Sequence, residues 1–478
     1  MDAFAGLDEA TLDRARISRD PRFDGKFFIA VRTTGIYCRP ICPSPRSKKI
    51  NVTYYLTAAA AAAAGYRPCR RCRPEVAPGS PAWQGPSAVV RRALRLIHEG
   101  CLDVGSVEAL AARVGIGSRH LDRLFVQHVG VPPLAVGQTR RLHFAKQLLD
   151  QTDLRIIDIA MAAGFRSVRR FNDAILKAFG KSPRELRRRA AVEASGRRSE
   201  FVELKLSYRP PYDWQHLIAY LGEHAIQGVE RVAADEYWRT LALPNAHVIV
   251  SVRPLLGESG LSLRVSGAPA SALLELSTAA KRVFDLNGDP EPIAEVLAAD
   301  PLLRPLLNKR PGLRVPGVWN PFECAVRAVL GLMANDVGSV WVDRLVKVSG
   351  RPIATGIAGL THLFPTPLEV LESANEDLGF PESRLMTLRA LARAVHEKKI
   401  DFAVQSEDVL RALRSVPGVD DDIAEYVALR ACGEPDAFPA SDRVLRGLVA
   451  DLETRADAWR PWRGYALMHL WEAGQFQE

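Results

Sequence analysis

The 478-residue chain lacks any hydrophobic run that approaches the roughly 20 residues a helix needs to cross a bilayer. Its seven consecutive alanines, at positions 58–64, are too few to span a membrane and too weakly apolar to anchor the chain to one. No basic segment followed by an apolar one opens the sequence, so no secretory signal is expected. These absences exclude a membrane-spanning protein and predict one that works in the cytoplasm.

Cysteine is scarce beyond the first 72 residues. Only Cys101, Cys324 and Cys432 occur there, far apart in the sequence, and in a reducing compartment we expect buried core thiols rather than disulfides. Wholesale disorder is excluded because 47% of the residues are hydrophobic. A chain of this length predicts about three domains, each large enough to bury its own core.

Acidic residues are scarce in the first part of the chain. Residues 1–200 hold 35 Lys and Arg against 18 Asp and Glu, a net charge of +17. Residues 201–478 hold 29 against 37, a net charge of −8. Because the positive excess is confined to one region, we expect that region to bind nucleic acid.

Four cysteines stand in two pairs near the start of the chain. Three residues separate Cys38 from Cys42, two separate Cys69 from Cys72, and 26 residues lie between the pairs. Each pair can grip one ion from a tight turn while the intervening segment folds back to complete a tetrahedral site. The spacing therefore predicts a Zn²⁺ site with four thiolate ligands.

A closed site of four thiolates is usually structural, so one interpretation is a zinc knuckle that stabilises the fold and takes part in no reaction. The surrounding residues favour a second interpretation, because a zinc–thiolate cluster ringed by cations suits an anionic substrate. The nine cations are Arg32, Arg39, Arg46, Lys48, Lys49, Arg67, Arg70, Arg71 and Arg73.

Two helix-turn-helix units are predicted between linker-like stretches at 73–87 and 190–200. In the first unit Ser106 is a capping residue, apolar residues follow at helical spacing, and a glycine turn precedes the second helix. The pattern recurs about fifty residues later, which would place two recognition helices in successive major grooves. Any one polar residue on these helices could instead belong to a solvated face. The candidate DNA contacts are Ser118, Arg119, His120, Arg123, Arg166, Ser167, Arg169, Arg170 and Asn172.

The remaining chain changes character at about residue 206. Alternating segments at 247–253 and 261–265 predict strands of a small α+β domain, and the pattern after residue 311 is helical. Within it, residues 413–430 contain an apolar-Pro-Gly-apolar turn between two helices, which is typical of a helix-hairpin-helix. The backbone N–H groups at such a turn, here around Gly418, hold a DNA phosphate.

The N-terminal motifs resemble known families. Residues 27–40 and 65–72 are similar to the zinc domain of the Ada family of bacterial DNA methyl-damage sensors, and the tandem helix-turn-helix resembles the AraC family. The first resemblance implies that Cys38 accepts a methyl group from a DNA methylphosphotriester. A zinc-bound thiolate is a competent nucleophile, and nothing would restore the resulting thioether, so the transfer should be single-turnover.

Methylation would change the charge of the cluster from −2 to −1. At about 6 Å from a phosphate and an effective dielectric constant near 40, that change is worth on the order of 1.4 kcal/mol, or about tenfold in affinity. We therefore expect the methylated protein to bind double-stranded DNA more tightly and to activate transcription, with RNA polymerase as a further partner.

Three C-terminal motifs, at 210–214, 413–430 and 437–471, resemble the AlkA type of 3-methyladenine DNA glycosylase over nearly all of 206–472. The resemblance implies that Asp442 is the catalytic carboxylate, which stabilises positive charge developing on the deoxyribose of an N-alkylated purine. Met333 matches the wedge that enters the DNA stack, and Asp422 stands where bifunctional relatives carry a Schiff-base lysine, so no lyase activity is expected. The candidate base-pocket residues are Trp214, Tyr220, Tyr426 and Trp471.

The sequence departs from the glycosylase family at the hairpin, where Asp420, Asp421 and Asp422 lie beside the expected phosphate site. Their repulsion of DNA leaves open a transcription factor whose glycosylase half is weak or inactive. A zinc-stapled repair enzyme without a regulatory role is a third possibility. No string resembles the second methyltransferase domain of the Ada family, so repair of O6-methylguanine is not predicted.

The expected fold is multidomain and mainly α with α+β parts, and the protein is expected to be a monomer. The four expected domains are a zinc and methyl-acceptor domain at 1–76, a tandem helix-turn-helix at 84–190, an α+β domain at 201–287 and a helix-hairpin-helix glycosylase domain at 300–478.

Overall fold

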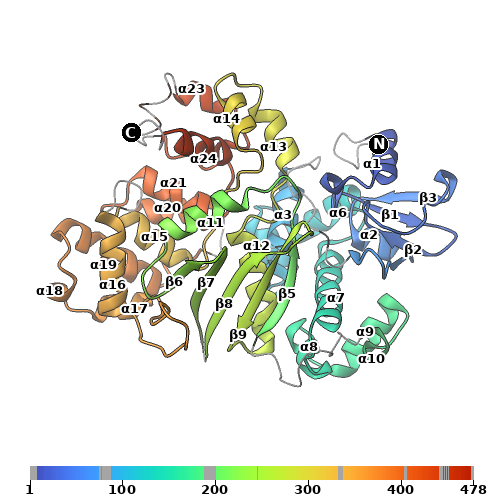
Figure 1. Cartoon of the computed structure of the whole chain (residues 1–478), viewed down its shortest axis with the longest axis horizontal. Coiled ribbons are helices and arrows are strands. Elements are labelled where there is room, and N and C mark those ends of the chain that lie inside the picture. Colours follow the sequence, from blue (N-terminus) through green and yellow to red (C-terminus); the bar gives the residue numbers. More distant parts are fainter. Residues whose placement is uncertain are drawn as a thin grey trace.

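The fold, taken from a computed structural model, is mainly helical with two small sheets, as expected for a multidomain α protein with α+β parts (Figure 1). Among the described residues no helix is both long enough and apolar enough to cross a membrane. The structure describes residues 8–74, 77, 88–98, 100–187, 201–244, 246–331, 337–402, 406–440, 445, 447, 449 and 452–474.

A four-stranded sheet of order β3-β1-β2-β4 forms the centre of the N-terminal domain. Strand β1 is buried along its whole length because α1 covers one face of the sheet and the polyalanine helix α2 covers the other. Strands β1, β2 and β3 pair antiparallel, whereas β2 and β4 pair in parallel. The elements are α1 (Glu9–Ser18), β1 (Phe28–Val31), β2 (Ile36–Cys38), β3 (Val52–Tyr55), α2 (Ala58–Ala63) and β4 (Arg67–Pro68).

The next eight helices contain both predicted helix-turn-helix units. Ser106 caps α5 through its side chain, and Ser167 caps α9 in the same way, so the start signals in the sequence act as expected. The 19-residue helix α7 joins the two units. The helices are α3 (Ala88–His98), α4 (Cys101–Val104), α5 (Val107–Arg113), α6 (Ser118–Val129), α7 (Pro133–Gln151), α8 (Ile156–Ala162), α9 (Val168–Phe179) and α10 (Pro183–Leu186).

The zinc domain touches both units. A Cβ atom at Gly130, the C-cap of α6, would lie 3.6 Å from Ala60 of α2. A Cβ at Gly180, the C-cap of α9, would lie 2.7 Å from Nη1 of Arg67 in β4. Two neighbouring elements of the zinc domain, α2 and β4, therefore contact one helix-turn-helix unit each.

A five-stranded antiparallel sheet of order β5-β9-β8-β7-β6 occupies the middle of the molecule (Figure 1). Its core includes Leu204, Val250 and Leu263, and continues into the second helix-turn-helix unit through residues such as Phe171. The elements are β5 (Val202–Ser207), α11 (Trp214–Glu223), β6 (Glu230–Ala233), β7 (Glu236–Leu243), β8 (Ala246–Pro254), β9 (Gly260–Ser266) and α12 (Leu273–Val283).

The C-terminal helices form two adjoining cores. One gathers α15, α16, α19, α20 and α21, and the other gathers α13, α14, α23 and α24 (Figure 1). The elements are α13 (Pro290–Leu297), α14 (Leu303–Lys309), α15 (Pro321–Val329), α16 (Val337–Ser349), α17 (Pro367–Glu372), α18 (Asn375–Leu378), α19 (Glu382–His396), α20 (Ser406–Arg414), α21 (Asp421–Arg430), α23 (Leu452–Asp457) and α24 (Arg463–Gly474).

Buried ion pairs join the zinc domain to the C-terminal half. The ammonium of Lys26 lies 3.0 Å from Asp289 and 2.9 Å from Glu291, and the Lys26 side chain is only 5% exposed. The fully buried Arg209 donates from Nε to the carbonyl of Asp24 at 3.0 Å. The two halves of the chain therefore share an ordered, charged interface.

Candidate functional site

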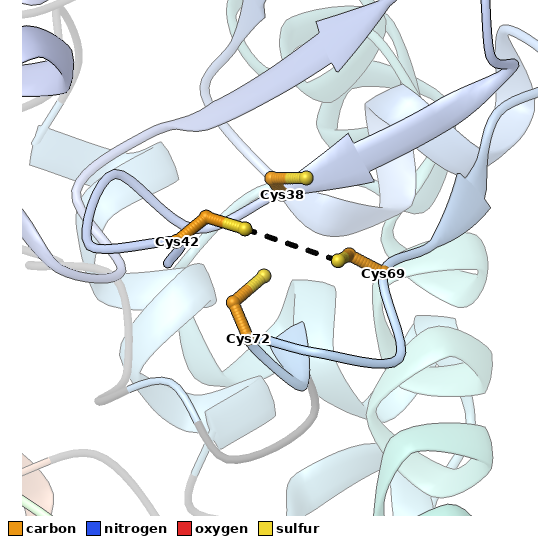
Figure 2. Close-up of side chains that lie close together, drawn as sticks. All are labelled: Cys38, Cys42, Cys69 and Cys72. Carbon is orange, nitrogen blue, oxygen red and sulfur yellow. Dashed lines mark hydrogen bonds between the residues drawn. The ribbon is translucent and has the colours of Figure 1, made fainter. Parts of the chain in front are cut away.

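The four cysteines of the predicted metal site come together at the carboxyl ends of two adjacent parallel strands. Cys38 ends β2, and Cys69 directly follows its parallel neighbour β4, while each partner cysteine lies in the turn that comes next. All four Sγ atoms lie within 4.8 Å of one another, and Figure 2 shows the sulfurs pointing into one shared space. Four thiolates at this separation fit a tetrahedral zinc ion.

The members of this cysteine cluster differ in exposure. Cys69 and Cys72 are 7% and 6% exposed, whereas Cys38 and Cys42 are only half-buried. The backbone N–H of Arg39 donates to the Cys72 sulfur at 3.3 Å, which makes that sulfur a weaker nucleophile. A substrate arriving from solvent therefore reaches Cys38 and Cys42 first.

Without metal, the cluster thiols compete for protons. Hydrogen bonding with Cys42 and Cys69 raises the pKa of Cys38, while hydrogen bonding with Cys38 lowers the pKa of Cys42 to about 6. A bound divalent cation instead favours the thiolate form of every ligand, so metal binding must release protons.

Two of the cations expected around the cluster form ion pairs with buried carboxylates. Arg39 is 7% exposed and forms a buried ion pair with Asp24. Arg73, which follows Cys72, lies 3.1 Å from Asp150 of α7. These two arginines hold the site in place, and the remaining seven, including Arg70 and Arg71, are exposed.

The predicted DNA contacts of the helix-turn-helix units lie at the starts of α6 and α9. Ser118 and Ser167 are half-buried, Ser167 serving as the cap of α9. His120 and Arg123 lie one turn apart on α6, with Nδ1 and Nη2 at 3.2 Å. The exposed members of the set are Arg119, His120, Arg123, Arg166, Arg169, Arg170 and Asn172.

The predicted hairpin lies between α20 and α21. Gly418 has a φ of +86°, and a Cβ there would lie 2.0 Å from Oγ1 of Thr387, so only glycine fits. Asp420 caps α21 by accepting from the N–H of Ile423 at 2.8 Å. Asp421 lies 2.6 Å from Nε of Arg414. Two of the three hairpin carboxylates therefore have structural roles that reduce their repulsion of DNA.

Three of the four predicted pocket aromatics come together. Tyr220 and Tyr426 line one pocket, and the ring of Trp471 lies 6.4 Å from that of Tyr426. Trp214 lies elsewhere, in the core of the α+β domain, where its indole N–H donates to Asp235 at 2.6 Å and its ring stacks on Phe284. We therefore assign Trp214 to packing.

Arg430 is a pocket residue that no sequence motif predicted. Its guanidinium lies 5.0 Å from the Tyr220 ring and 5.5 Å from the Tyr426 ring, and it donates to the Tyr220 hydroxyl at 2.9 Å. Burial raises the pKa of Tyr426, which keeps that phenol neutral.

A buried ionic network forms the floor of the same pocket. Arg239 pairs with Glu230 at 2.6 Å and with Glu323, and Arg327 lies 3.4 Å from both carboxylates. Burial acts to raise the pKa of Glu230, but the two arginines outweigh it and lower that pKa. A signal was present in the sequence, since Glu323 and Arg327 stand four residues apart on an otherwise apolar helix.

Asp442 and Met333, the predicted catalytic carboxylate and wedge, lie outside the described residues. Phe438, just before Asp442 in the sequence, is described, and its N–H donates to Glu425 of α21 at 3.1 Å. The chain that leads to Asp442 is therefore attached to the second helix of the hairpin motif.

A relative matches almost the whole chain. The probable bifunctional transcriptional activator/DNA repair enzyme AlkA of Mycobacterium tuberculosis (strain CDC 1551 / Oshkosh) is 40% identical over 472 residues, covering 96% of this chain and 95% of the relative. The chain belongs to this AlkA family of bifunctional transcriptional activators and DNA repair enzymes. The zinc domain and the glycosylase-like half are thus joined in the AlkA family member as they are here.

Three family models match successive parts of this AlkA family chain. The metal-binding domain of Ada matches residues 11–75, a helix-turn-helix domain matches 110–189, and the AlkA N-terminal domain matches 203–320. The first match spans all four cysteines, so the cofactor of the cluster is Zn²⁺. The second identifies a DNA-binding protein.

Relatives of each half are also found separately. DNA-3-methyladenine glycosylase 2 of Escherichia coli (strain K12) is 30% identical over 277 residues, covering 56% of this chain and 95% of the relative. The bifunctional transcriptional activator/DNA repair enzyme Ada of the same organism is 41% identical over 133 residues, covering 28% of this chain and 36% of the relative. The resemblances to the Ada zinc domain and to the AlkA type of glycosylase are confirmed.

Proposed function

We propose that this protein responds to DNA alkylation in two ways, by taking a methyl group from DNA methylphosphotriesters onto Cys38 and by excising N-alkylated purines. The observation that carries the first activity is the cysteine cluster, in which Cys38 and Cys42 are half-buried and the other two sulfurs are buried. The resemblance to the Ada zinc domain selects Cys38 from the accessible pair.

The methyl transfer is a single displacement. When bound, zinc keeps the cluster sulfurs ionised at neutral pH. The Cys38 sulfur attacks the methyl carbon, a sulfur–carbon bond forms as the carbon–oxygen bond breaks, and the phosphodiester leaves as a stable anion. No proton is transferred, and no group in the site regenerates the thiolate, so each protein molecule acts once.

Alkylation of Cys38 removes one negative charge from the cysteine cluster of the zinc domain. The weaker repulsion of phosphate favours promoter binding by α6 and α9, and hence activation of transcription in contact with RNA polymerase. We propose that the protein does this as a monomer, because one chain carries two recognition helices.

The proposed glycosylase acts on a base flipped into the pocket of Tyr220, Tyr426 and Trp471. Aromatic faces favour an electron-deficient, alkylated purine, and Asp442 would stabilise the positive charge that develops on the deoxyribose. Met333 would fill the space left in the duplex. Asp422 replaces the lysine of bifunctional relatives, so we propose base release without strand cleavage.

An inactive glycosylase half is the competing proposal. The structural roles of Asp420 and Asp421 argue against it, because a cap and an ion pair with Arg414 explain these carboxylates without loss of the phosphate site. The grouping of Tyr220, Tyr426 and Trp471 points the same way.

The methyl transfer is tested by mass spectrometry after incubation of the zinc-loaded protein with methylphosphotriester oligonucleotides. We expect one methyl group, about 14 daltons, on the peptide that contains Cys38 in wild type and in Cys42→Ser, provided that variant retains its metal, and none in Cys38→Ser. Methylation of residue 42 in the wild type would overturn the assignment of the acceptor.

The glycosylase is tested by base release from methylated duplex DNA. Wild type should release 3-methyladenine, and Asp442→Asn should reduce the rate by several orders of magnitude. Equal rates would remove Asp442 from the mechanism, and no release by either protein would favour the inactive glycosylase half.

A further inference from the structure

A cleft of about 650 Å³ lies where the first helix-turn-helix unit meets the glycosylase half. Cations from both sides face it. Two lie one turn apart on α3, one ends α5, one lies near the end of α12, and one follows α19. The cations are Arg92, Arg95, Arg113, Arg282 and Lys398, and the acidic residue among the described lining is Asp401.

Two of these arginines have no carboxylate partner among the residues that the structure describes. Arg113 forms no hydrogen bond or ion pair with any residue the structure describes, and Arg282 donates only to the carbonyl of Val318 at 3.4 Å. The Nε atoms of both are buried. Buried donors are normally satisfied, so a site that leaves the Nε donors of two guanidinium groups without acceptors calls for an anion or ordered water.

The other arginines are held in place by pairs outside the cleft. Nη2 of Arg92 lies 2.8 Å from Glu407, while Arg95 donates to the Gly433 carbonyl at 2.8 Å and lies 3.2 Å from Glu434. These contacts tie α3 of the DNA-binding half to the glycosylase half. They fix the arginine stems while leaving an excess of positive charge in the cleft, which costs free energy unless a counter-charge enters.

We propose that this cleft binds a phosphorylated ligand of nucleotide size, and that the ligand bridges the two halves of the protein. Guanidinium groups bind phosphate oxygens in pairs, and the cleft volume falls within the range of small-ligand sites. Leu96, Val395 and Phe402 supply an apolar wall beside the cations, against which a base can pack. The phosphates come either from a free nucleotide or from a nucleic-acid backbone.

The proposal is tested by calorimetric titration of the full-length, zinc-loaded protein at physiological salt. The probes are tripolyphosphate, ATP and a single-stranded hexathymidylate, each titrated into wild type and into the double variant Arg113→Gln/Arg282→Gln. The matched control is Arg411→Gln, an exposed arginine of α20 that pairs with Asp408 and does not line the cleft. A thermal denaturation scan without ligand shows whether each variant is folded.

The double variant should bind the cleft ligand at least about tenfold more weakly, and the control should match wild type. Loss of tripolyphosphate and ATP binding identifies a free polyphosphate as the source, and loss of hexathymidylate binding alone identifies a nucleic-acid backbone. Binding of none of the probes to wild type, or equal binding by wild type and the folded double variant, overturns the site. These outcomes do not depend on the chemistry proposed for Cys38 or Asp442.

Discussion

Glu323 is a buried carboxylate whose charge stabilises the fold. It is 1% exposed and pairs with Arg239 and Arg327 beneath the aromatic pocket. Its partners lie 84 residues away and four residues away. Glu323 and Arg327 on an otherwise apolar helix indicate that a further charged residue lies buried beside them. The sequence does not show that this residue is Arg239.

Glu323→Gln should lower the free energy of unfolding by about 3 kcal/mol, because it leaves the buried guanidinium groups without one of their two carboxylates. Chemical denaturation measures the change. Glu258→Gln, which breaks an exposed ion pair with Lys205 at 2.9 Å, is the matched control and should change little. Similar behaviour of both variants would contradict a structural role for the network.

His143 predicts a dependence of stability on pH. Burial lowers its pKa to about 4, and its Nε2 lies 2.9 Å from the hydroxyl of Tyr37, the neighbour of Cys38. The unfolded chain takes up a proton at this histidine below about pH 6.5, whereas the folded protein does so only near pH 4. The unfolded state binds more protons in this window, so stability falls as the pH is lowered through it.

His143→Gln should reduce the slope of unfolding free energy against pH between about 6.5 and 4, by up to about 1.4 kcal/mol per pH unit. Denaturation curves at several pH values measure the slope. His396→Gln, at an exposed position on α19, should leave it as in wild type. An unchanged slope in the His143 variant would show that another group is responsible.

Among the helices and strands, those with local signals could be predicted from the sequence. Ser106 and Ser167 cap the helices expected of them, and the Pro-Gly turn at Gly418 lies between two helices. Trp214 could not be placed, because whether an aromatic residue packs in a core or lines a pocket depends on neighbours distant in the sequence. The assembly of the four cysteines was predictable because spacing and ligand chemistry limit it to few arrangements.

Gly418→Ala should lower the free energy of unfolding by at least about 2 kcal/mol, since the position needs a positive φ and has no room for a Cβ beside Thr387. The loss should be accompanied by weaker binding of abasic-site DNA, which fluorescence anisotropy measures. Gly222→Ala is the matched control, because its Cβ would make ordinary contact with Val232 at 3.5 Å inside helix α11. An equal effect of the two changes would refute the steric argument.

At the scale of the whole molecule, no sequence pattern predicted that the N-terminal and C-terminal halves pack against each other. The linker-like stretches at 73–87 and 190–200 predict where domains are divided, but not whether the domains touch. In the structure Lys26 of the zinc domain is instead enclosed by Asp289 and Glu291, and Arg92 reaches Glu407. Contacts between residues more than 250 positions apart depend on the final packing, which local spacing does not encode.

Lys26→Ala should weaken the coupling between the halves, because it leaves the buried carboxylate of Asp289 without its cation. Differential scanning calorimetry should show a broader or divided thermal transition, with the zinc domain unfolding at the lower temperature. Lys399→Ala, which removes an exposed cation 2.7 Å from Glu397, should leave the profile as in wild type. A single, unshifted transition in the Lys26 variant would mean that the halves are held together by other contacts.

The bracing of both helix-turn-helix units by the zinc domain, through Ala60 and Arg67, has a consequence for the operator sequence. Helix α7, whose 19 residues span about 28 Å, joins the two units, and their contacts with the zinc domain leave little freedom to adjust the spacing of the two recognition helices. The two half-sites must then keep a fixed phase around the DNA axis. Inserting five base pairs between them would turn one half-site to the opposite side of the duplex and abolish simultaneous recognition. Inserting a full turn would restore the phase, but the two half-sites would then lie farther apart than the two recognition helices can span.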